Sequence, residues 1–381
     1  MSRTKLLFTP GPLTTSETVK KSMLRDVGSR DREFLGEVSA IRRSLLALGN
    51  ADDSYTAVLM QGSGTFAVES VLSTIIPRNG KLLVAINGAY GRRMAGIATV
   101  LGIPCEGIIF DEATPVSTER VAAALAEDAA ITHLATVHCE TSTGILNPVA
   151  ELGRAASRLG RIFIVDAMSS FGGIPIDVVS DHIDFLISSA NKCIQGVPGF
   201  GFVLARLHLL EKAEGCARSV SLDLRAQWQG LEADGQFRFT PPTHALLAFA
   251  QALRELREEG GVESRAARYA ANHQALMHGM GALGFETYLA PHHQSHIITS
   301  FRYPLHPRFD FPEFYGRLSE LGFVIYPGKV SHADCFRIGT IGHLFPHDME
   351  ALVGAIRQVL AGMQIDSARA SLPVGRTEAY E

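Results

Sequence analysis

Ser188-Ser189-Ala190-Asn191-Lys192 is the stretch that decides the fold, because it places a lysine directly after an apolar run over residues 183–187. Farther upstream, a second apolar run over residues 161–165 ends at Asp166. Both runs are short and rich in Ile and Phe, as expected for buried strands of a parallel sheet. Open α/β sheets bind their ligands beyond the carboxyl ends of the strands. The sequence therefore predicts that Lys192 and Asp166 lie at one ligand site.

This pair of residues predicts pyridoxal phosphate chemistry. A lysine amine with a lowered pKa binds the aldehyde of this cofactor, and burial beside a cationic ring lowers the pKa in that way. A carboxylate beside the pyridine nitrogen keeps that nitrogen protonated, so that the ring accepts electrons from the substrate. Taken singly, Lys192 can be an exposed lysine at a strand end, and Asp166 can be a helix or turn cap. Their combination favours catalytic roles for both.

Short apolar runs alternate with helical patterns from about residue 56 to 205. This alternation is typical of βαβ units around a mostly parallel sheet, and it predicts an α/β fold. The predicted strands cover residues 56–60, 81–86, 105–110, 131–138, 161–165, 183–188 and 200–205. Predicted helices between them include 65–76, 92–101 and 148–159.

The pattern changes beyond Pro241-Pro242, where two long helical stretches cover residues 244–259 and 262–283. The remainder suits a small α+β domain, with strands over 297–301, 323–325 and 335–338 and helices over 311–321 and 347–360. We therefore predict an N-terminal segment (1–19), a large cofactor-binding domain (20–258), a small C-terminal domain (259–365) and a tail (366–381).

Composition and charge narrow the class of protein. The 381 residues are 46% hydrophobic, and 35 Lys and Arg against 39 Asp and Glu give a net charge of −4. Without a long block of one charge sign, the chain lacks the electrostatic footprint that nucleic-acid binding requires. Five scattered cysteines without CxxC spacing favour free thiols in the cytoplasm. We expect no signal peptide and no membrane span, because no suitable apolar run is present.

Gln61-Gly62-Ser63-Gly64-Thr65 follows a predicted strand and begins a predicted helix. Backbone N–H groups, the hydroxyls of Ser63 and Thr65 and the positive helix end converge there, with Gly64 permitting a tight turn. That arrangement suits a phosphate group. Ser and Thr cap helices in many proteins, so the turn is a weak signal by itself. It matches neither a Walker loop nor GxGxxG, and so indicates a single phosphate rather than a nucleotide.

Further candidate residues follow other predicted strands. Tyr90, in Asn87-Gly88-Ala89-Tyr90-Gly91, can stack on a cofactor ring, and it can equally be a core residue. Residues 138–144, HCETSTG, place Thr141 and Thr143 where they can bind the phenolic oxygen or the phosphate of the cofactor. Arg337 lies in a predicted strand of the second domain, where a guanidinium can bind a substrate carboxylate through two hydrogen bonds. An ordinary ion pair is the alternative for Arg337.

The cysteines and histidines give weaker signals. Cys139 and Cys193 follow strand ends, but small buried hydrophobic residues explain them more simply than thiol catalysis does. The 14 histidines form no HExxH motif, and the cluster of His292, His293 and His296 lacks a nearby carboxylate or cysteine. We therefore predict no metal site.

With these residues, the chain resembles the fold-type I pyridoxal phosphate aminotransferases of the alanine-glyoxylate branch, class V. The resemblance covers nearly the whole chain and leaves out the tail after Gly362. The matching segments are 7–15 (LFTPGPLTT), 61–65 (QGSGT), 138–141 (HCET), 219–224 (SVSLDL), 238–244 (RFTPPTH) and 322–329 (GFVIYPGK). The last three resemble the members of the branch that act on a phosphonate.

The resemblance implies a role for each candidate residue. Lys192 would bind the cofactor covalently, and Asp166 would contact the pyridine nitrogen. The phosphate would be bound by Ser63, Gly64 and Thr65, while Tyr90 would stack on the ring and Thr141 and Thr143 would lie along the cofactor. Arg337 would bind the carboxylate of pyruvate or alanine. Thr240 would reach the phosphate from the neighbouring subunit of a homodimer. Ser142 replaces the threonine of many phosphonate-specific members, and residues 26–33 vary, which leaves the contacts with the phosphonate unassigned.

The reaction implied is the transfer of an amino group from 2-aminoethylphosphonate to pyruvate, which yields phosphonoacetaldehyde and L-alanine. An aminotransferase that uses alanine or serine with glyoxylate is the alternative within the family. A pyridoxal phosphate lyase or cysteine desulfurase is a second alternative, but it needs a mobile cysteine, for which Cys193 and Cys335 are poorly placed. A noncatalytic nucleotide-binding module is the alternative from another class, and it predicts a protein without a yellow, borohydride-reducible chromophore.

Overall fold

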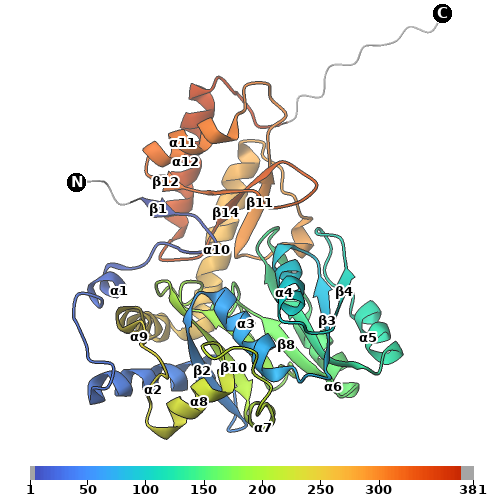
Figure 1. Ribbon diagram of the computed structural model, residues 1–381. Coiled ribbons are helices and arrows are strands. Elements are labelled where there is room, and N and C mark those ends of the chain that lie inside the picture. Colours follow the sequence, from blue (N-terminus) through green and yellow to red (C-terminus); the bar gives the residue numbers. More distant parts are fainter. Residues whose placement is uncertain (1–4, 370–381) are drawn as a thin grey trace, which may run out of the picture.

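The structure, a computed structural model, describes residues 5–369. A larger part at the bottom of Figure 1 contains the main sheet, and a smaller part at the top contains helices α11 (Phe311–Glu320) and α12 (Pro346–Gly362). Residues 1–4 and 370–381 lie outside the described residues, and with them most of the tail predicted over 366–381.

The main sheet has seven strands in the order β2-β10-β9-β8-β5-β3-β4. Its strands are β2 (Tyr55–Gly62), β3 (Lys81–Ile86), β4 (Cys105–Ile109), β5 (Ile131–Val137), β8 (Ile162–Asp166), β9 (Phe185–Ser189) and β10 (Gly199–Arg206). Strand β10 runs antiparallel to both of its neighbours, and the other pairs are parallel. The predicted α/β fold with a mostly parallel sheet is confirmed, and the ends of β8 and β9 carry Asp166 and the lysine loop to the same edge.

Helices cover this sheet and bury its apolar strands. They are α1 (Glu17–Lys21), α2 (Arg32–Leu48), α3 (Gly64–Ile75), α4 (Ala89–Val100), α5 (Thr118–Glu127), α6 (Val149–Arg158), α7 (Leu207–Lys212), α8 (Leu224–Ala233) and α9 (Thr243–Glu258). The inner strands are buried on both faces, as in β8, where Phe163, Ile164 and Val165 are fully inaccessible to solvent, whereas the edge strand β4 is partly exposed. Helix α4 begins three residues earlier than the sequence pattern predicts, because Glu140 contacts its first turn.

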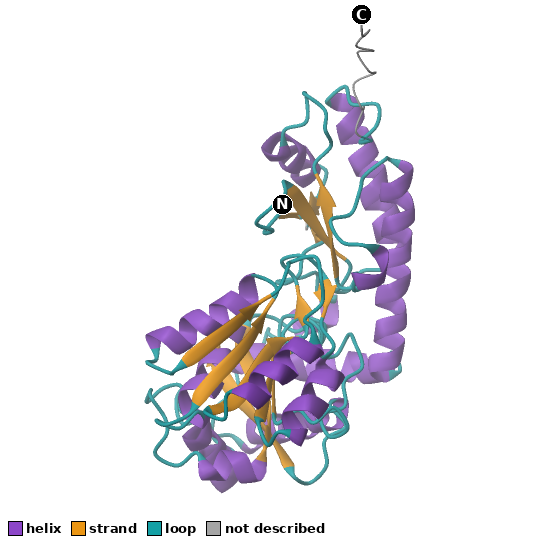
Figure 2. Cartoon of the chain, turned by 90° about the vertical axis from the view of Figure 1, so that its right-hand side faces the viewer, coloured by secondary structure: helices purple, strands orange, loops and turns teal. Residues whose placement is uncertain are grey.

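The smaller part is built on helix α10 (Gly261–Ala282), the long helix that runs along the side of the molecule in Figure 2. It contains a three-stranded antiparallel sheet in the order β11-β14-β13, formed by β11 (Ile298–Arg302), β14 (Cys335–Gly339) and β13 (Tyr326–Pro327). The remaining short elements are β1 (Leu6–Leu7), β6 (Cys139–Glu140), β7 (Ile145–Leu146), the 3₁₀ helix η1 (Pro291–His293) and β12 (Phe323–Val324). The strand predicted over 323–325 corresponds to β12, and β13 follows it after Ile325.

Two large hydrophobic clusters hold these parts, and a smaller third cluster contains residues of both, among them Cys193 and Ile298. Of the two large clusters, one surrounds the main sheet, and the other packs α10, α11 and α12 against the small sheet. Phe8 belongs to the second cluster, because β1 pairs in parallel with β12. Burial of a phenylalanine of this kind contributes about 1.5–3 kcal/mol. The N-terminal segment is therefore fixed to the smaller part, and the residues that follow Phe8 pass over the edge of the main sheet where Lys192 lies.

Candidate active site

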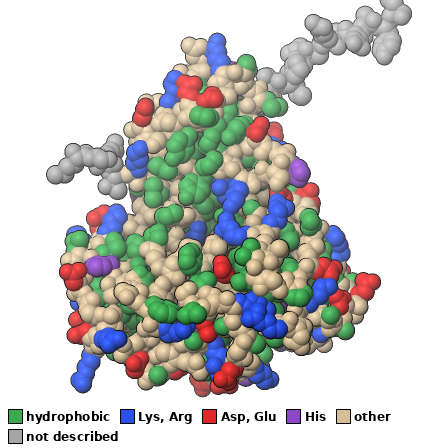
Figure 3. Space-filling model, viewed as in Figure 1, with side chains coloured by type: hydrophobic (Ala, Val, Ile, Leu, Met, Phe, Trp, Pro, Cys, Tyr) green, Lys and Arg blue, Asp and Glu red, His purple; other side chains and the backbone are tan. Residues whose placement is uncertain are grey.

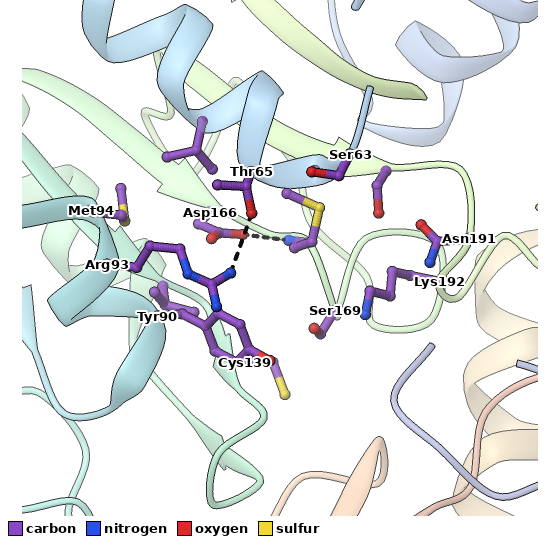
Figure 4. Close-up of a pocket in the computed structure, with 15 residues that line it drawn as sticks. Ser63, Thr65, Tyr90, Arg93, Met94, Cys139, Asp166, Ser169, Asn191 and Lys192 are labelled. Carbon is purple, nitrogen blue, oxygen red and sulfur yellow. Dashed lines mark hydrogen bonds between the residues drawn. The ribbon is translucent and has the colours of Figure 1, made fainter. Parts of the chain in front are cut away.

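A cavity lies beyond the carboxyl ends of the parallel strands of the main sheet. Six of the ten predicted site residues line it: Ser63, Gly64, Thr65, Tyr90, Asp166 and Lys192. They come from the loops after β2, β3, β8 and β9, which all end at the same edge of the sheet. Figure 4 shows Lys192 on one side of this cavity and Asp166, Thr65 and Tyr90 on the other.

Lys192 is held by the N-terminal segment. Its Nζ donates hydrogen bonds to the carbonyl oxygens of Pro10, at 2.7 Å, and Gly11, at 3.4 Å. Burial lowers the pKa of Lys192, and the nearby Tyr90 and Asp166 oppose this shift. Gly11 has a φ of +109°, and an added Cβ there would lie 2.7 Å from Cδ of Lys192, so this close approach requires glycine. The site therefore contains an oriented amine with the lowered pKa that a nucleophile or general base needs.

Asp166 is the last residue of β8, and 6% of it is exposed. One carboxylate oxygen accepts a hydrogen bond from the backbone N–H of Met168, at 2.9 Å. Burial raises the pKa of Asp166 to about 6, against the lowering effects of that hydrogen bond and of the Lys192 charge. The turn-cap role considered from the sequence is therefore present, and the carboxylate also faces the cavity, where a cationic ligand atom would stabilise its charge.

The turn before α3 lies in the cavity wall, where the sequence predicts a phosphate cradle. Ser63 is the N-cap residue of α3, but its side chain makes no capping hydrogen bond, so its hydroxyl is available to a ligand. An added Cβ on Gly64 would lie 2.3 Å from Sδ of Met168, which explains why glycine occupies this position. Within residues 5–369, the buried hydroxyl of Ser189 has no partner, and this residue also lines the cavity. The helix end and these free hydroxyls fit a phosphate group.

Tyr90 lies in the first turn of α4, half-buried at the cavity wall. Two cations approach its ring: the Arg93 guanidinium carbon lies 4.9 Å from the ring centroid and Nζ of Lys329 lies 4.3 Å from it. Burial opposes ionisation of the phenol, but a hydrogen bond with Thr141 and the charges of Lys329, Lys192 and Arg337 outweigh it and lower the pKa of Tyr90. Tyr90 is therefore a cavity residue surrounded by positive charge.

Glu140 fixes the start of α4 from outside the helix. Its fully buried carboxylate accepts hydrogen bonds from the backbone N–H groups of Tyr90, at 3.0 Å, and Gly91, at 3.3 Å, and from the hydroxyl of Ser142, at 2.8 Å. An added Cβ on Gly88 would lie 2.2 Å from Cγ of Glu140, so glycine is needed beside it. This contact starts the helix three residues before the predicted position, since a carboxylate at a helix N-terminus satisfies otherwise unpaired N–H groups.

Arg337 lies in β14, next to Tyr90, and it does not line the cavity itself. Its Nη1 and Nε donate hydrogen bonds to the carbonyl oxygens of Thr141, at 2.7 Å, and Pro327, at 2.9 Å. Burial lowers the pKa of Arg337, and Tyr90 opposes this shift. Within the described residues no carboxylate pairs with Arg337, so the ordinary ion pair considered from the sequence is absent there. The guanidinium is fixed by backbone groups and keeps its charge available to an anion.

The remaining three predicted residues lie around the cavity rather than in its wall. Thr141 and Thr143 are buried in the turn after β6, where the Thr143 hydroxyl donates a hydrogen bond to the Glu140 carbonyl, at 3.3 Å. Thr240 is exposed, and its carbonyl oxygen accepts a hydrogen bond from Nε2 of Gln61, at 3.4 Å. The structure therefore brings Thr240 next to the strand that leads into the phosphate cradle, on the outer surface of this chain.

Several residues in and around the cavity were missed from the sequence. Arg93 lines the cavity and donates a hydrogen bond to the Thr65 hydroxyl, at 3.3 Å. Its spacing of three residues from Tyr90 was a usable signal, because residues i and i+3 share one face of a helix. Ser189 was visible in the quoted stretch before Lys192. Glu140 gave no signal of its own, because its contacts with α4 join segments 50 residues apart.

The described residues contain no group of three or more His, Cys, Asp and Glu side chains that could hold a metal ion. Among the same residues, no helix is both long enough and apolar enough to cross a membrane.

A mostly parallel sheet with a half-buried lysine and a buried aspartate at its strand ends is typical of the fold-type I aminotransferases. The chain belongs to the class-V aminotransferase family, whose model matches residues 14–314. It is 58% identical over 356 residues to the 2-aminoethylphosphonate–pyruvate transaminase of Syntrophobacter fumaroxidans, which covers 93% of this chain and 96% of the relative. The corresponding enzyme of Vibrio vulnificus is 54% identical over 362 residues, covering 94% of this chain and 99% of the relative.

Solved structures agree on the fold. Ureidoglycine–glyoxylate aminotransferase from Bacillus subtilis superimposes with a TM-score of 0.88 and 22% identity, over 96% of this chain and 95% of that structure. Alanine–glyoxylate aminotransferase from Nostoc gives a TM-score of 0.87 and 24% identity, over 94% of this chain and 96% of that structure. At these identities the likeness establishes the fold and leaves the substrates open.

Proposed function

We propose that this protein binds pyridoxal 5'-phosphate and transfers the amino group of 2-aminoethylphosphonate to pyruvate, producing phosphonoacetaldehyde and L-alanine. The observation that carries the proposal is the half-buried amine of Lys192, which lines a cavity together with Asp166 and the turn before α3. The names of relatives more than 50% identical over nearly the whole chain support these substrates. Five free cysteines support a location in the cytoplasm.

The residues of the cavity fit the cofactor. The hydroxyls of Ser63, Thr65 and Ser189 and the N-terminus of α3 would hold its phosphate, and Asp166 would hold its pyridine nitrogen. Lys192 would bind the aldehyde of the cofactor, and the ring of Tyr90 would stack on the ring of the cofactor. When bound, the cofactor supplies an electron sink for the substrate carbon that loses a proton.

The protein groups then have distinct tasks in the reaction. The Lys192 amine takes a proton from the substrate carbon that bears the amino group and delivers it to the cofactor carbon that carried the aldehyde, and in the second half-reaction it moves a proton in the reverse direction. The carbonyl of Pro10 orients that amine, and the buried carboxylate of Asp166 stabilises a cation opposite it. Arg337 binds the carboxylate of pyruvate or alanine, because its backbone hydrogen bonds hold it in place before substrate arrives.

The proposed function is tested by measuring products with purified protein loaded with pyridoxal phosphate. We expect alanine to form from 2-aminoethylphosphonate and pyruvate, with little or no reaction from alanine plus glyoxylate or serine plus glyoxylate. Turnover restricted to glyoxylate would overturn the substrate assignment. A protein that binds no cofactor would overturn the function altogether.

Thiol chemistry has little support in this structure. Burial raises the pKa of Cys193 to about 12 and that of Cys335 to about 11. A desulfurase needs a thiolate that can reach the substrate, and these thiols stay protonated near neutral pH. The desulfurase alternative is therefore disfavoured.

We infer that the protein works as a homodimer in which Thr240 reaches the cofactor phosphate of the partner subunit. An exposed apolar patch supports this inference: Phe66 is 50%, Phe239 45% and Val220 75% exposed. These residues adjoin one another, because Gln61 donates to the carbonyl of Phe239, Phe66 packs on Gly62, and Arg238 donates to the carbonyl of Val220. Apolar side chains gathered beside an active site are typical of a protein interface.

The substitution Phe239→Asp is expected to weaken dimerisation by about 30-fold or more, because aromatic residues at interface centres commonly contribute 2 kcal/mol or more. Cofactor affinity should fall with it, since Thr240 lies in the adjoining position. Sedimentation velocity over a range of protein concentrations measures the first effect, and spectral titration with the cofactor measures the second. Leu305→Asp, at a 73% exposed position in the smaller part, is the matched control. Unchanged sedimentation of Phe239→Asp would place the interface elsewhere.

A further inference from the structure

Positive charge is concentrated around the phenol of Tyr90. The charges of Lys329, Lys192 and Arg337 all act on this group, and the Arg93 guanidinium lies over its ring. On the molecular face shown in Figure 3, Lys and Arg side chains gather where the smaller part meets the larger part. Buried carboxylates near this group, Glu140 and Asp166, are engaged by backbone N–H groups of their own surroundings. The site therefore has more cations than the carboxylate of pyruvate or alanine requires.

Lys329 is the cation of this group that has no assigned task. Its Nζ lies 4.3 Å from the centroid of the Tyr90 ring. Within residues 5–369, its ammonium forms neither an ion pair nor a hydrogen bond with another side chain. The donors of this ammonium are therefore available to a ligand, and charge-assisted hydrogen bonds make an anion the ligand that they bind most strongly.

The loop that carries Lys329 is fixed at both ends. Before it, Tyr326 pairs with Arg337 across the small sheet. After it, the backbone N–H and the hydroxyl of Ser331 donate to the two carboxylate oxygens of Glu112, at 2.9 and 3.0 Å. Glu112 is buried and also pairs with Arg92 of the larger part. This anchoring holds Lys329 over Tyr90 without using its charge.

We propose that Lys329 binds the phosphonate group of the amino donor, together with Arg337, and that it discriminates this donor from amino acids. The proposal rests on the proposed function and names the residue that selects its substrate. A phosphonate carries up to two negative charges near neutral pH, whereas a carboxylate carries one. In 2-aminoethylphosphonate the phosphorus is also one bond farther from the reacting carbon than the carboxylate carbon of alanine is. A second cation in addition to Arg337 would match both the larger negative charge of the phosphonate and its greater distance from the reacting carbon.

The test compares two half-reactions of the cofactor-loaded protein, followed by the absorbance change of the cofactor. For Lys329→Gln, the concentration of 2-aminoethylphosphonate needed for half-maximal rate is expected to rise about 10- to 100-fold, the usual effect of losing a hydrogen bond to a charged group. The corresponding value for L-alanine should change by less than about twofold. Lys329→Arg keeps the charge and should retain most of the affinity for the phosphonate. Lys212→Gln, at an exposed position of α7, is the matched control.

Binding without turnover provides an independent readout. Calorimetric titration of the same proteins with ethylphosphonate should show weaker binding to Lys329→Gln, with acetate binding unchanged. Equal effects on both donors, or no effect on the phosphonate, would overturn the role of Lys329 while leaving the proposed function intact. A wild-type protein that binds ethylphosphonate through Lys329 but does not transaminate 2-aminoethylphosphonate would overturn the proposed function and leave the anion site in place.

Discussion

Replacement of Lys192 by alanine is expected to reduce turnover by about 10⁴-fold or more. The substitution removes both the amine that binds the cofactor covalently and the group that moves the substrate proton, and general acid–base catalysis alone contributes up to about 10⁴-fold. No other residue of the cavity wall replaces it, because Arg93, the other cation there, carries a guanidinium rather than an amine that could bind the aldehyde of the cofactor. The fold should persist, since the Lys192 side chain is held by hydrogen bonds to Pro10 and Gly11 rather than by the core.

Three measurements check this expectation. Borohydride reduction followed by mass spectrometry should detect the cofactor adduct on the wild type and on Lys212→Ala, and not on Lys192→Ala. Rates should be measured for both half-reactions, because loss of proton transfer affects them equally. Small primary amines added to Lys192→Ala should restore part of the rate, since they can carry the missing proton. Retention of even a tenth of wild-type turnover by Lys192→Ala would remove Lys192 from the mechanism.

Asp166→Asn is expected to weaken cofactor binding by about 10²-fold or more and to lower turnover further. The aspartate provides the negative charge for a protonated pyridine nitrogen, and loss of one partner of a buried charge pair costs about 3–5 kcal/mol. Asparagine keeps the shape of the side chain and an oxygen for the hydrogen bond from Met168. The weaker cofactor binding and the lower turnover should therefore result from the lost charge rather than from a change of packing.

The same substitution should have the opposite effect on the protein without cofactor. The pKa of Asp166 rises from 3.8 to about 6 on folding, so between these values the folded chain holds a proton that the unfolded chain has released. Stability conferred by this group therefore falls as pH rises through that window, by about 3 kcal/mol in all. Asp166→Asn avoids this cost and should melt at a higher temperature than the wild type at pH 8, with little difference near pH 4.

Thermal melting of both proteins, with and without pyridoxal phosphate, measures these effects. The wild type should gain more from the cofactor at pH 8 than at pH 5, because its carboxylate is ionised only at the higher pH. Asp166→Asn should gain little at either pH. If the variant bound the cofactor as tightly as the wild type, the pairing of Asp166 with the pyridine nitrogen would be wrong.

The sequence alone determined the fold class and the chemical centre of the site. Short apolar runs that end on Lys192 and Asp166 predicted strands with functional side chains at their ends, and the turn at 63–65 predicted a phosphate cradle. The structure confirms the sheet and brings these residues to one cavity. Such features are readable because strand burial, strand ends and helix starts depend on neighbouring residues in the chain.

Tertiary structure alone decided how these groups are oriented and charged. Lys192 is held by Pro10, 182 residues away in sequence, and Arg337 is held by Thr141, 196 residues away. Lys329 likewise reaches Tyr90 through a loop anchored on the larger part. Local patterns carry no information about such contacts. Their pKa shifts and their geometry arise from burial and from charges that meet only when two hydrophobic cores have packed against each other.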